Sequence, residues 1–435
     1  MKPKGLLISV VLLAVLGGGI WWSNKTEAKK AAKGTDTSTK ILTIPDDQIQ
    51  QIHIKKVTGE TENLVREGGK WRITEPKPLP ADQDAVASMV TSLSSLNADK
   101  VLEEKADDLK QYGLSDPTLT IQVTRKDGKT DELLVGNDTP TGSGAYAKLA
   151  NDPRVFTIAT FVKTGLDKRP EDLRDKRLLT FNQDKLTRVD LQAKGQTVEF
   201  GKDAQNEWQI VKPRPLRADS SAVNTLVEKL RDAKMDLTAP GDAAKAFASS
   251  PRVATATVTD ASGTYTLEVR KDKEKNYYAK SSAVEGVYKI PVDVGDSLDK
   301  SVDDFRNKKV FDFGFSDPSR VDVKGASYTK SGDKWMSGGK TMDNGTVQTL
   351  IDKLRDLSAT KFVDRAGGEP VFDATVTSNN GKRVEKVTIR KQGAQFFAQR
   401  DNEPSIYELD PKAVEDLQKA AADVKEAAPE TAKKK

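Results

Sequence analysis

The sequence has no cysteine and a single histidine, so the commonest catalytic and metal-binding side chains are missing. Without cysteine there are no disulfides, no thiolate nucleophile and no Cys-ligated zinc or iron–sulfur site. The one histidine, His53, lies between Ile52 and Ile54 in an alternating segment, and we expect it to point away from their face. A Ser-His-Asp or Cys-His arrangement cannot be assembled. We therefore predict no catalytic residues, no metal and no cofactor.

An excess of one charge is also lacking. The net charge is only +5 over 435 residues, and aromatic residues make up 6% of the chain. No basic stripe with interleaved aromatics stands out, which argues against a nucleic-acid partner. The 65 Asp and Glu residues leave a carboxylate acid–base pair open, because the spatial separation of carboxylates cannot be seen in a sequence.

Long hydrophobic runs are scarce, with one conspicuous run near the N-terminus. The uncharged segment from Gly5 to Trp22 is rich in Leu, Val and Ile and ends in two tryptophans. Its length is at the short end for crossing a bilayer, and paired Trp suits the interface. We predict a signal anchor or transmembrane helix in residues 1–24 and a flexible tether in 25–40, with a cleaved signal peptide and a buried helix as alternatives. The expected location is the bacterial inner membrane, single-pass, with the bulk of the chain periplasmic.

What the sequence does contain is an internal repeat. A set of residues recurs with a constant offset of 137, and a more divergent copy follows it. The recurring positions are Trp71, Pro76, Pro78 and Asp82 in the first copy, Trp208, Pro213, Pro215 and Asp219 in the second, and Trp335 and Asp343 in the third. The third copy lacks the Pro-x-Pro. Tyr146 and Tyr278 also match within Tyr-Ala-Lys, and Tyr112-Gly113 marks a turn before a strand in the first copy.

Each recurring aspartate stands before an apolar i, i+3, i+4, i+7 pattern, which predicts an amphipathic helix. Residues 223–232 and 347–356, for example, read VNTLVEKLRD and VQTLIDKLRD. We interpret the aspartates as N-caps, with a triplicated acidic binding site as the alternative. The Pro-x-Pro is expected to stiffen the approach to the helix, or else to be an exposed ligand for a partner.

Short alternating segments with Gly- and Pro-containing turns surround each helix, which predicts antiparallel strands. The expected fold class is α+β: after the transmembrane helix come three tandem repeats of a mainly antiparallel sheet with one amphipathic helix each. The predicted boundaries are 41–179, 180–310 and 311–427, followed by a polar tail at 428–435. The third copy ends in an Ala- and Lys-rich segment from about Pro411 that also favours helix.

These motifs resemble a known family. Trp-x-Ile, Pro-x-x-x-x-Ala-Asp, Tyr-Gly-Leu-x-x-Pro, Tyr-Ala-Lys and Leu-Arg-Asp-Lys are similar to those of the uncharacterised bacterial DUF4340 proteins. The resemblance is best in the first copy and partial in the third. It implies an N-terminal membrane segment and association with an ABC-type transport system of the gliding-motility auxiliary kind. It supplies no active site.

The function expected from these features is non-enzymatic. We predict a membrane-anchored extracytoplasmic accessory or scaffold protein that contacts ABC-transporter subunits or another envelope protein. The first alternative is a module that binds an envelope glycan or lipid, with four aromatic residues as a stacking surface: Tyr277, Tyr278, Phe396 and Phe397. A carboxylate-based hydrolase is the third possibility.

Overall fold

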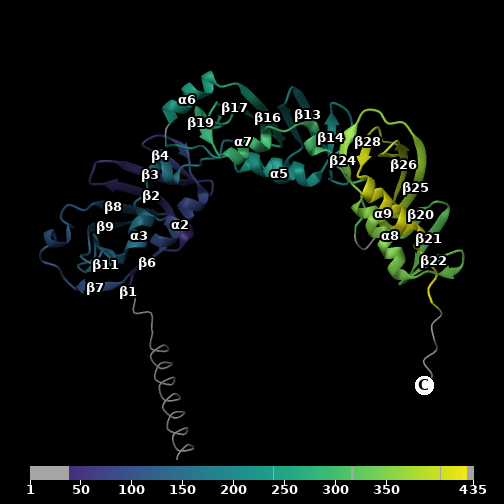
Figure 1. Cartoon of the computed structure of the whole chain (residues 1–435). Helices are drawn as coiled ribbons and strands as arrows, with labels where there is room; N and C mark the ends of the chain where they lie inside the picture. The colour runs from purple at the N-terminus through teal and green to yellow at the C-terminus, as the bar shows by residue number, and fades with distance from the viewer. Residues whose placement is uncertain (1–38, 239, 315–317, 402, 429–435) are drawn as a thin grey trace, which may run out of the picture. The chain divides into compact units, whose positions relative to one another are not determined.

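The computed structural model describes residues 39–238, 240–314, 318–401 and 403–428 (Figure 1). The predicted anchor and nearly all of the predicted tether and tail lie outside these residues. Among the described helices, none is long and apolar enough to cross a membrane. The chain divides into two compact bodies, the first ending at Lys176 and the second beginning at Arg177.

Three sheets share the order of eight strands, and the first and third of them carry a ninth strand, β7 or β24, at one edge. In each, two antiparallel meanders meet at their first strands, and a helix connects one meander to the other. The orders are β5-β4-β3-β2-β8-β9-β10-β11-β7, then β15-β14-β13-β12-β16-β17-β18-β19, then β23-β22-β21-β20-β25-β26-β27-β28-β24. From here on, the first, second and third copies are the described residues within 39–176, 177–308 and 309–428.

The elements of the first copy are β1 (Thr39–Thr43), β2 (Ile49–Lys56), β3 (Thr61–Glu67), β4 (Lys70–Glu75), β5 (Leu79–Pro80), α2 (Gln83–Ser94), β6 (Ser95–Ala98), β7 (Lys100–Glu103), β8 (Leu119–Arg125), β9 (Thr130–Asp138), β10 (Gly144–Leu149), β11 (Val155–Ala159), α3 (Thr160–Leu166) and α4 (Pro170–Leu173). Those of the second are β12 (Arg188–Ala193), β13 (Gln196–Lys202), β14 (Trp208–Lys212), β15 (Leu216–Arg217), α5 (Ser220–Arg231), α6 (Pro240–Ser249), β16 (Arg252–Asp260), β17 (Gly263–Lys271), β18 (Tyr277–Ser281), β19 (Val287–Ile290) and α7 (Val292–Leu298). Those of the third are β20 (Arg320–Val323), β21 (Ala326–Ser331), β22 (Lys334–Ser337), β23 (Lys340–Thr341), α8 (Asn344–Asp356), β24 (Ala359–Val363), β25 (Glu369–Ser378), β26 (Arg383–Gln392), β27 (Gln395–Arg400), β28 (Ile406–Leu409) and α9 (Pro411–Ala422).

The predicted fold class is wrong in its helices and in its sheets. In the described part of the chain, strand makes up 45% and helix 24%, in four sheets and eight helices. The fourth sheet pairs β1 with β6. The first and second copies each hold three helices, and the third holds two. Helices α3, α4 and α7 have only 7, 4 and 7 residues, too few for an apolar stripe to appear in the sequence.

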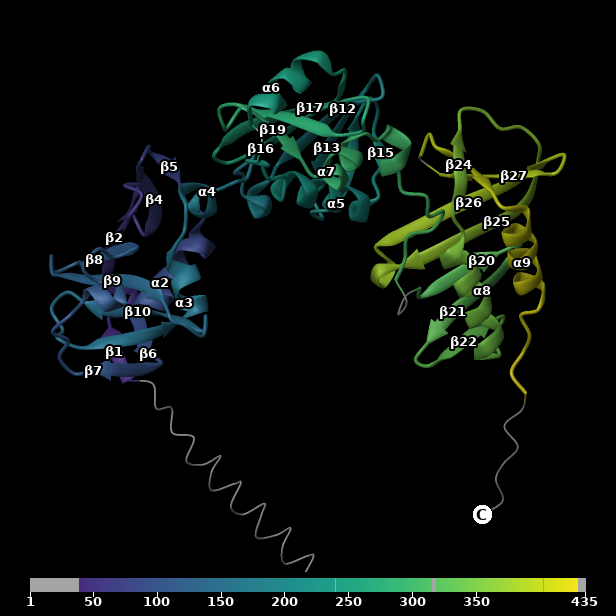
Figure 2. The same cartoon turned by 60° about the vertical axis from the view of Figure 1, so that its left-hand side comes forward.

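Each copy packs one helix that follows its recurring aspartate against its own sheet. The apolar positions of α2, α5 and α8 are buried in three separate cores, together with inward-facing residues of the respective sheets. In the third copy, α9 lies beside α8, as both views show (Figures 1 and 2). A helix on one sheet face buries the apolar side of both elements.

Candidate partner-binding site

The three recurring aspartates cap helices. The carboxylate of Asp82 accepts hydrogen bonds from two main-chain N–H groups of α2, each at 3.1 Å. Asp219 accepts two at 2.9 and 3.1 Å, whereas Asp343 accepts one at 2.9 Å. Their own N–H groups donate to Leu173, Phe305 and Lys425 at 2.7, 2.8 and 2.9 Å. Each aspartate thus links the N-terminus of its helix, through hydrogen bonds, to the C-terminal segment of the same copy.

The recurring tryptophans and prolines also lie at structural positions, in the cores and in turns. Trp71, Trp208 and Trp335 are buried in the three cores. The four prolines are exposed in the turns that precede β5 and β15: Pro76, Pro78, Pro213 and Pro215.

The turn at Tyr112-Gly113 is held by polar and aromatic contacts. The Tyr112 hydroxyl donates to Glu103 at 2.6 Å, and this bond raises the pKa of Tyr112 to about 12. Its ring meets that of Tyr146 edge-on, 5.0 Å between centroids. Gly113 adopts φ of 68°, and a Cβ there would meet the Asn137 side chain at 2.5 Å, so glycine fits this close turn.

Most of the aromatic residues considered for ligand stacking are buried. Tyr277 is fully buried, and Phe396 and Phe397 are 5% and 6% exposed. The Tyr277 ring lies so close to Gly295 of α7 that a Cβ there would come within 2.2 Å of it. Tyr278 is half-buried, and its hydroxyl donates to Asp272 at 3.1 Å. In the folded chain only Tyr278 of these four offers ring surface to a ligand.

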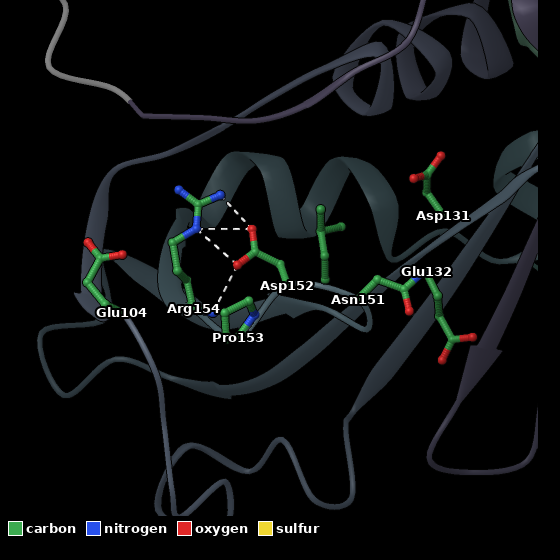
Figure 3. A pocket seen from close by; sticks show the side chains of 8 residues that line it. Glu104, Asp131, Glu132, Asn151, Asp152, Pro153 and Arg154 are labelled. Carbon is green, nitrogen blue, oxygen red and sulfur yellow. Dashed lines mark hydrogen bonds and ion pairs between the residues drawn. The ribbon is translucent and has the colours of Figure 1, made fainter.

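A cavity of about 440 Å³ opens in the first copy beside the loop between β10 and β11 (Figure 3). Its lining consists of Glu104, Asp131, Glu132, Leu149, Asn151, Asp152, Pro153 and Arg154. The Arg154 guanidinium donates hydrogen bonds to the Asp152 carboxylate. Its Nε lies 3.0 Å from both carboxylate oxygens, and a terminal nitrogen lies 2.5 Å from Oδ2. These hydrogen bonds hold the pKa of Asp152 below its ordinary value.

Negative charge exceeds positive charge in this lining. Four carboxylates face one guanidinium, and Asp131 is also paired with Arg125 at 2.5 Å. Figure 3 shows Glu104 on one side of the Asp152–Arg154 pair and Asp131 and Glu132 on the other. Among the described residues no group of His, Asp and Glu is arranged to hold a metal ion. The excess of negative charge suits the pocket to attract a cationic group.

The matching loop of the third copy, between β27 and β28, holds an arginine from the second copy. Glu403 Oε2 accepts from Arg217 Nε at 3.1 Å and from Arg400 Nε at 2.8 Å. Arg217 also donates to the Tyr407 hydroxyl at 2.9 Å, and Tyr407 donates to the other Glu403 oxygen. The side chains of Arg217 and Glu403 are 19% and 11% exposed, so this ion pair is largely removed from water.

A second arginine of the second copy reaches the same loop. Arg306 donates to the Ser405 hydroxyl at 2.9 Å, and its guanidinium carbon lies 3.4 Å from the centroid of the Phe362 ring. The Phe362 ring in turn packs against Tyr407. Stacking on an aromatic face and hydrogen bonding at the edge together suit the flat guanidinium group.

Strand register aligns the corresponding loops of the three copies residue by residue. Ala147 pairs with Phe156, Ala279 with Tyr288 and Ala398 with Tyr407, so the three loops have equal length. Asp152, Val284 and Glu403 therefore occupy one position. The neighbouring ladder places Asp131, Tyr265 and Glu385 at another. The first and third copies carry acids at both positions, and the second carries none.

Sequence reasoning missed this site because its charges form no motif. They lie at separate places in the repeat, and a signal appears only when the copies are aligned loop against loop and their charges compared. The recurring residues, by contrast, stood out because they are identical.

Comparison with known proteins agrees with the repeat. A family model described as "Domain of unknown function (DUF4340)" matches residues 71–246 and again residues 208–375. The two matches begin at Trp71 and Trp208, the same recurring residue. No curated protein and no solved structure gives a significant match.

Proposed function

The chain belongs to the DUF4340 family, and from that premise we propose that it is a non-enzymatic accessory or scaffold protein of the bacterial envelope. The observation that supports this role is that the residues shared by the copies are structural. The aspartates cap helices and the tryptophans fill cores, whereas the acids at the loop sites differ from copy to copy. Three copies of one fold multiply binding surface without adding chemistry.

The proposed location is the outer side of the bacterial inner membrane. The apolar run from Gly5 to Trp22 would serve as the anchor, and the three copies would be extracytoplasmic. Fusing alkaline phosphatase after Lys435 tests this, because that enzyme is active only after export. An active fusion agrees with the proposal. An inactive phosphatase together with a fluorescent cytoplasmic reporter at the same position contradicts it.

The proposed partner is another envelope protein, and an ABC-type transport system is the candidate that the family resemblance implies. Crosslinking in native membranes, followed by tagged purification in mild detergent and mass spectrometry, tests this directly. Recovery of transporter subunits in the crosslinked sample, and their absence from an uncrosslinked control of an unrelated anchored protein, supports the accessory role. A preparation free of any envelope subunit argues against it.

A further inference from the structure

We propose that the pocket beside the β10–β11 loop of the first copy binds an arginine presented by a partner protein, in the way that the third copy binds Arg217. The inference rests on the proposed function only for the statement that the partner is an envelope protein.

The acids of the two sites occupy the same positions. Asp152 corresponds to Glu403 and Asp131 to Glu385, and in the third copy these carboxylates bind arginine. Glu403 forms ion pairs with both Arg400 of its own copy and Arg217 of the second copy. In the first copy Leu149 stands at the position of Arg400. Arg154 and Arg125 pair with Asp152 and Asp131 in its place, so the acidic positions are retained with different local arginines.

The arginine that fills the third site is specific to the second copy. Isolated bridges align Ala81 with Arg174, Ala218 with Arg306 and Met342 with Glu426. The residues before Ala81, Ala218 and Met342 are Pro80, Arg217 and Thr341. Only the second copy therefore presents two arginines from this edge, and it presents them to the third copy.

These identities indicate that the partner is a different protein. A second molecule of this chain offers Thr341 and Glu426 at the edge of its third copy, which has the wrong charge. Its Arg217 is already bound within its own third copy.

The pocket has room and charge for the proposed group. Its volume of about 440 Å³ exceeds that of one guanidinium side chain, so flanking residues of the partner also fit. Glu104 is exposed and Glu132 half-buried, and both add negative charge beside the Asp152–Arg154 pair. A planar guanidinium can bind such carboxylates through two hydrogen bonds at once.

The chain itself supplies the probe. A fluorescent peptide of residues 212–219, sequence KPRPLRAD, reproduces the edge that the third copy receives. It is titrated against the purified full chain in mild detergent by fluorescence anisotropy. The comparison peptide carries citrulline in place of Arg217, which keeps the shape and removes the charge.

The variant that tests the pocket is Glu104→Gln with Glu132→Gln, because these side chains lie outside the Arg154 and Arg125 pairs. The matched control is Asp99→Asn with Asp116→Asn, two exposed carboxylates of the same copy that do not line the pocket. We expect the pocket variant to weaken binding about tenfold and the control to leave it unchanged.

Three results would overturn the inference: equal binding of the citrulline peptide, unchanged affinity of the pocket variant, or no binding up to roughly 5 mM peptide. The assay uses purified protein, so it is separate from the tests of export and of the envelope partner. Peptide binding with a cytoplasmic chain would refute the proposed function and keep the pocket assignment. An exported chain that does not bind the peptide would refute the pocket assignment and keep the proposed function.

Discussion

The loops of the first and third copies show how one fold is used in two ways. Both loops lie between the last two strands of a meander, and each combines one acid in the loop with a second acid on the neighbouring strand, at matching positions. In the third copy an arginine from the second copy is bound and mostly buried, whereas in the first the acids line an open pocket. The difference shows that the backbone of the repeat is shared, while a few charged residues decide which edges are joined.

The second copy completes the comparison, because Val284 in its loop and Tyr265 in β17 stand at the two acidic positions. It presents Arg217 and Arg306 to the third copy. The third copy receives them and ends its own edge in Thr341 and Glu426. Complementary charges therefore specify that the second copy binds the third, in that order.

The largest expected effect comes from removing the bound arginine. Arg217→Met leaves Glu403 partly buried without its second cation and should lower the stability of the third copy by about 3 kcal/mol. Hydrogen exchange read by mass spectrometry follows each copy separately. The control Arg320→Met removes an exposed pair with Asp322 and should leave the stability of the third copy essentially unchanged. Equal effects of the two variants would contradict the role given to Arg217.

A smaller effect is expected from the phenol that contacts the same pair. Tyr407→Phe removes the hydroxyl that bonds to Arg217 and Glu403, and should cost about 1.5 kcal/mol. Tyr328→Phe is the matched control, since Tyr328 is also buried in the same core, at 6% exposed, and burial alone raises its pKa. We expect protection of the third copy from exchange to fall for Tyr407→Phe only.

Removing the N-cap aspartates tests whether the three copies depend equally on the cap hydrogen bonds that they share. Asp82→Ala and Asp219→Ala each remove two cap hydrogen bonds and should each cost about 1 kcal/mol. Asp343→Ala removes one such bond and should cost less. The three variants are compared by the exchange protection of their own helices. A loss of protection in one copy only would mean that the caps are not equivalent.

The smallest effect concerns the open pocket and its pH dependence. Arg154 lowers the pKa of Asp152 in the folded chain, so the ionised carboxylate stabilises the fold. That stabilisation is complete above the unfolded pKa and is lost as pH falls through the folded value. Asp152→Asn should therefore reduce stability at pH 7 by no more than about 1 kcal/mol, and the difference should shrink as the pH falls below the ordinary pKa of an aspartate. Urea unfolding at several pH values measures it. A difference that grows in acid would contradict the sign.

Local patterns predicted part of the fold well. The apolar spacing after Asp82, Asp219 and Asp343 corresponds to α2, α5 and α8, and the family resemblance is confirmed by the matched residues. The shorter helices were missed because a helix of one or two turns leaves no periodic stripe. The burial of Phe396 and Phe397 was also hidden, because alternation assigns one of two neighbours to solvent, and other elements can cover that face.

Residue identity and neighbours within a few turns were enough to predict the repeat and the capped helices, and the lack of cysteine excludes thiol chemistry. Tertiary structure alone decided which charges meet. Arg217 and Glu403 are 186 positions apart, and nothing local to either residue indicates the other. Their pairing follows from strand register and from the docking of one copy on the next. The open pocket of the first copy became visible only through the same register.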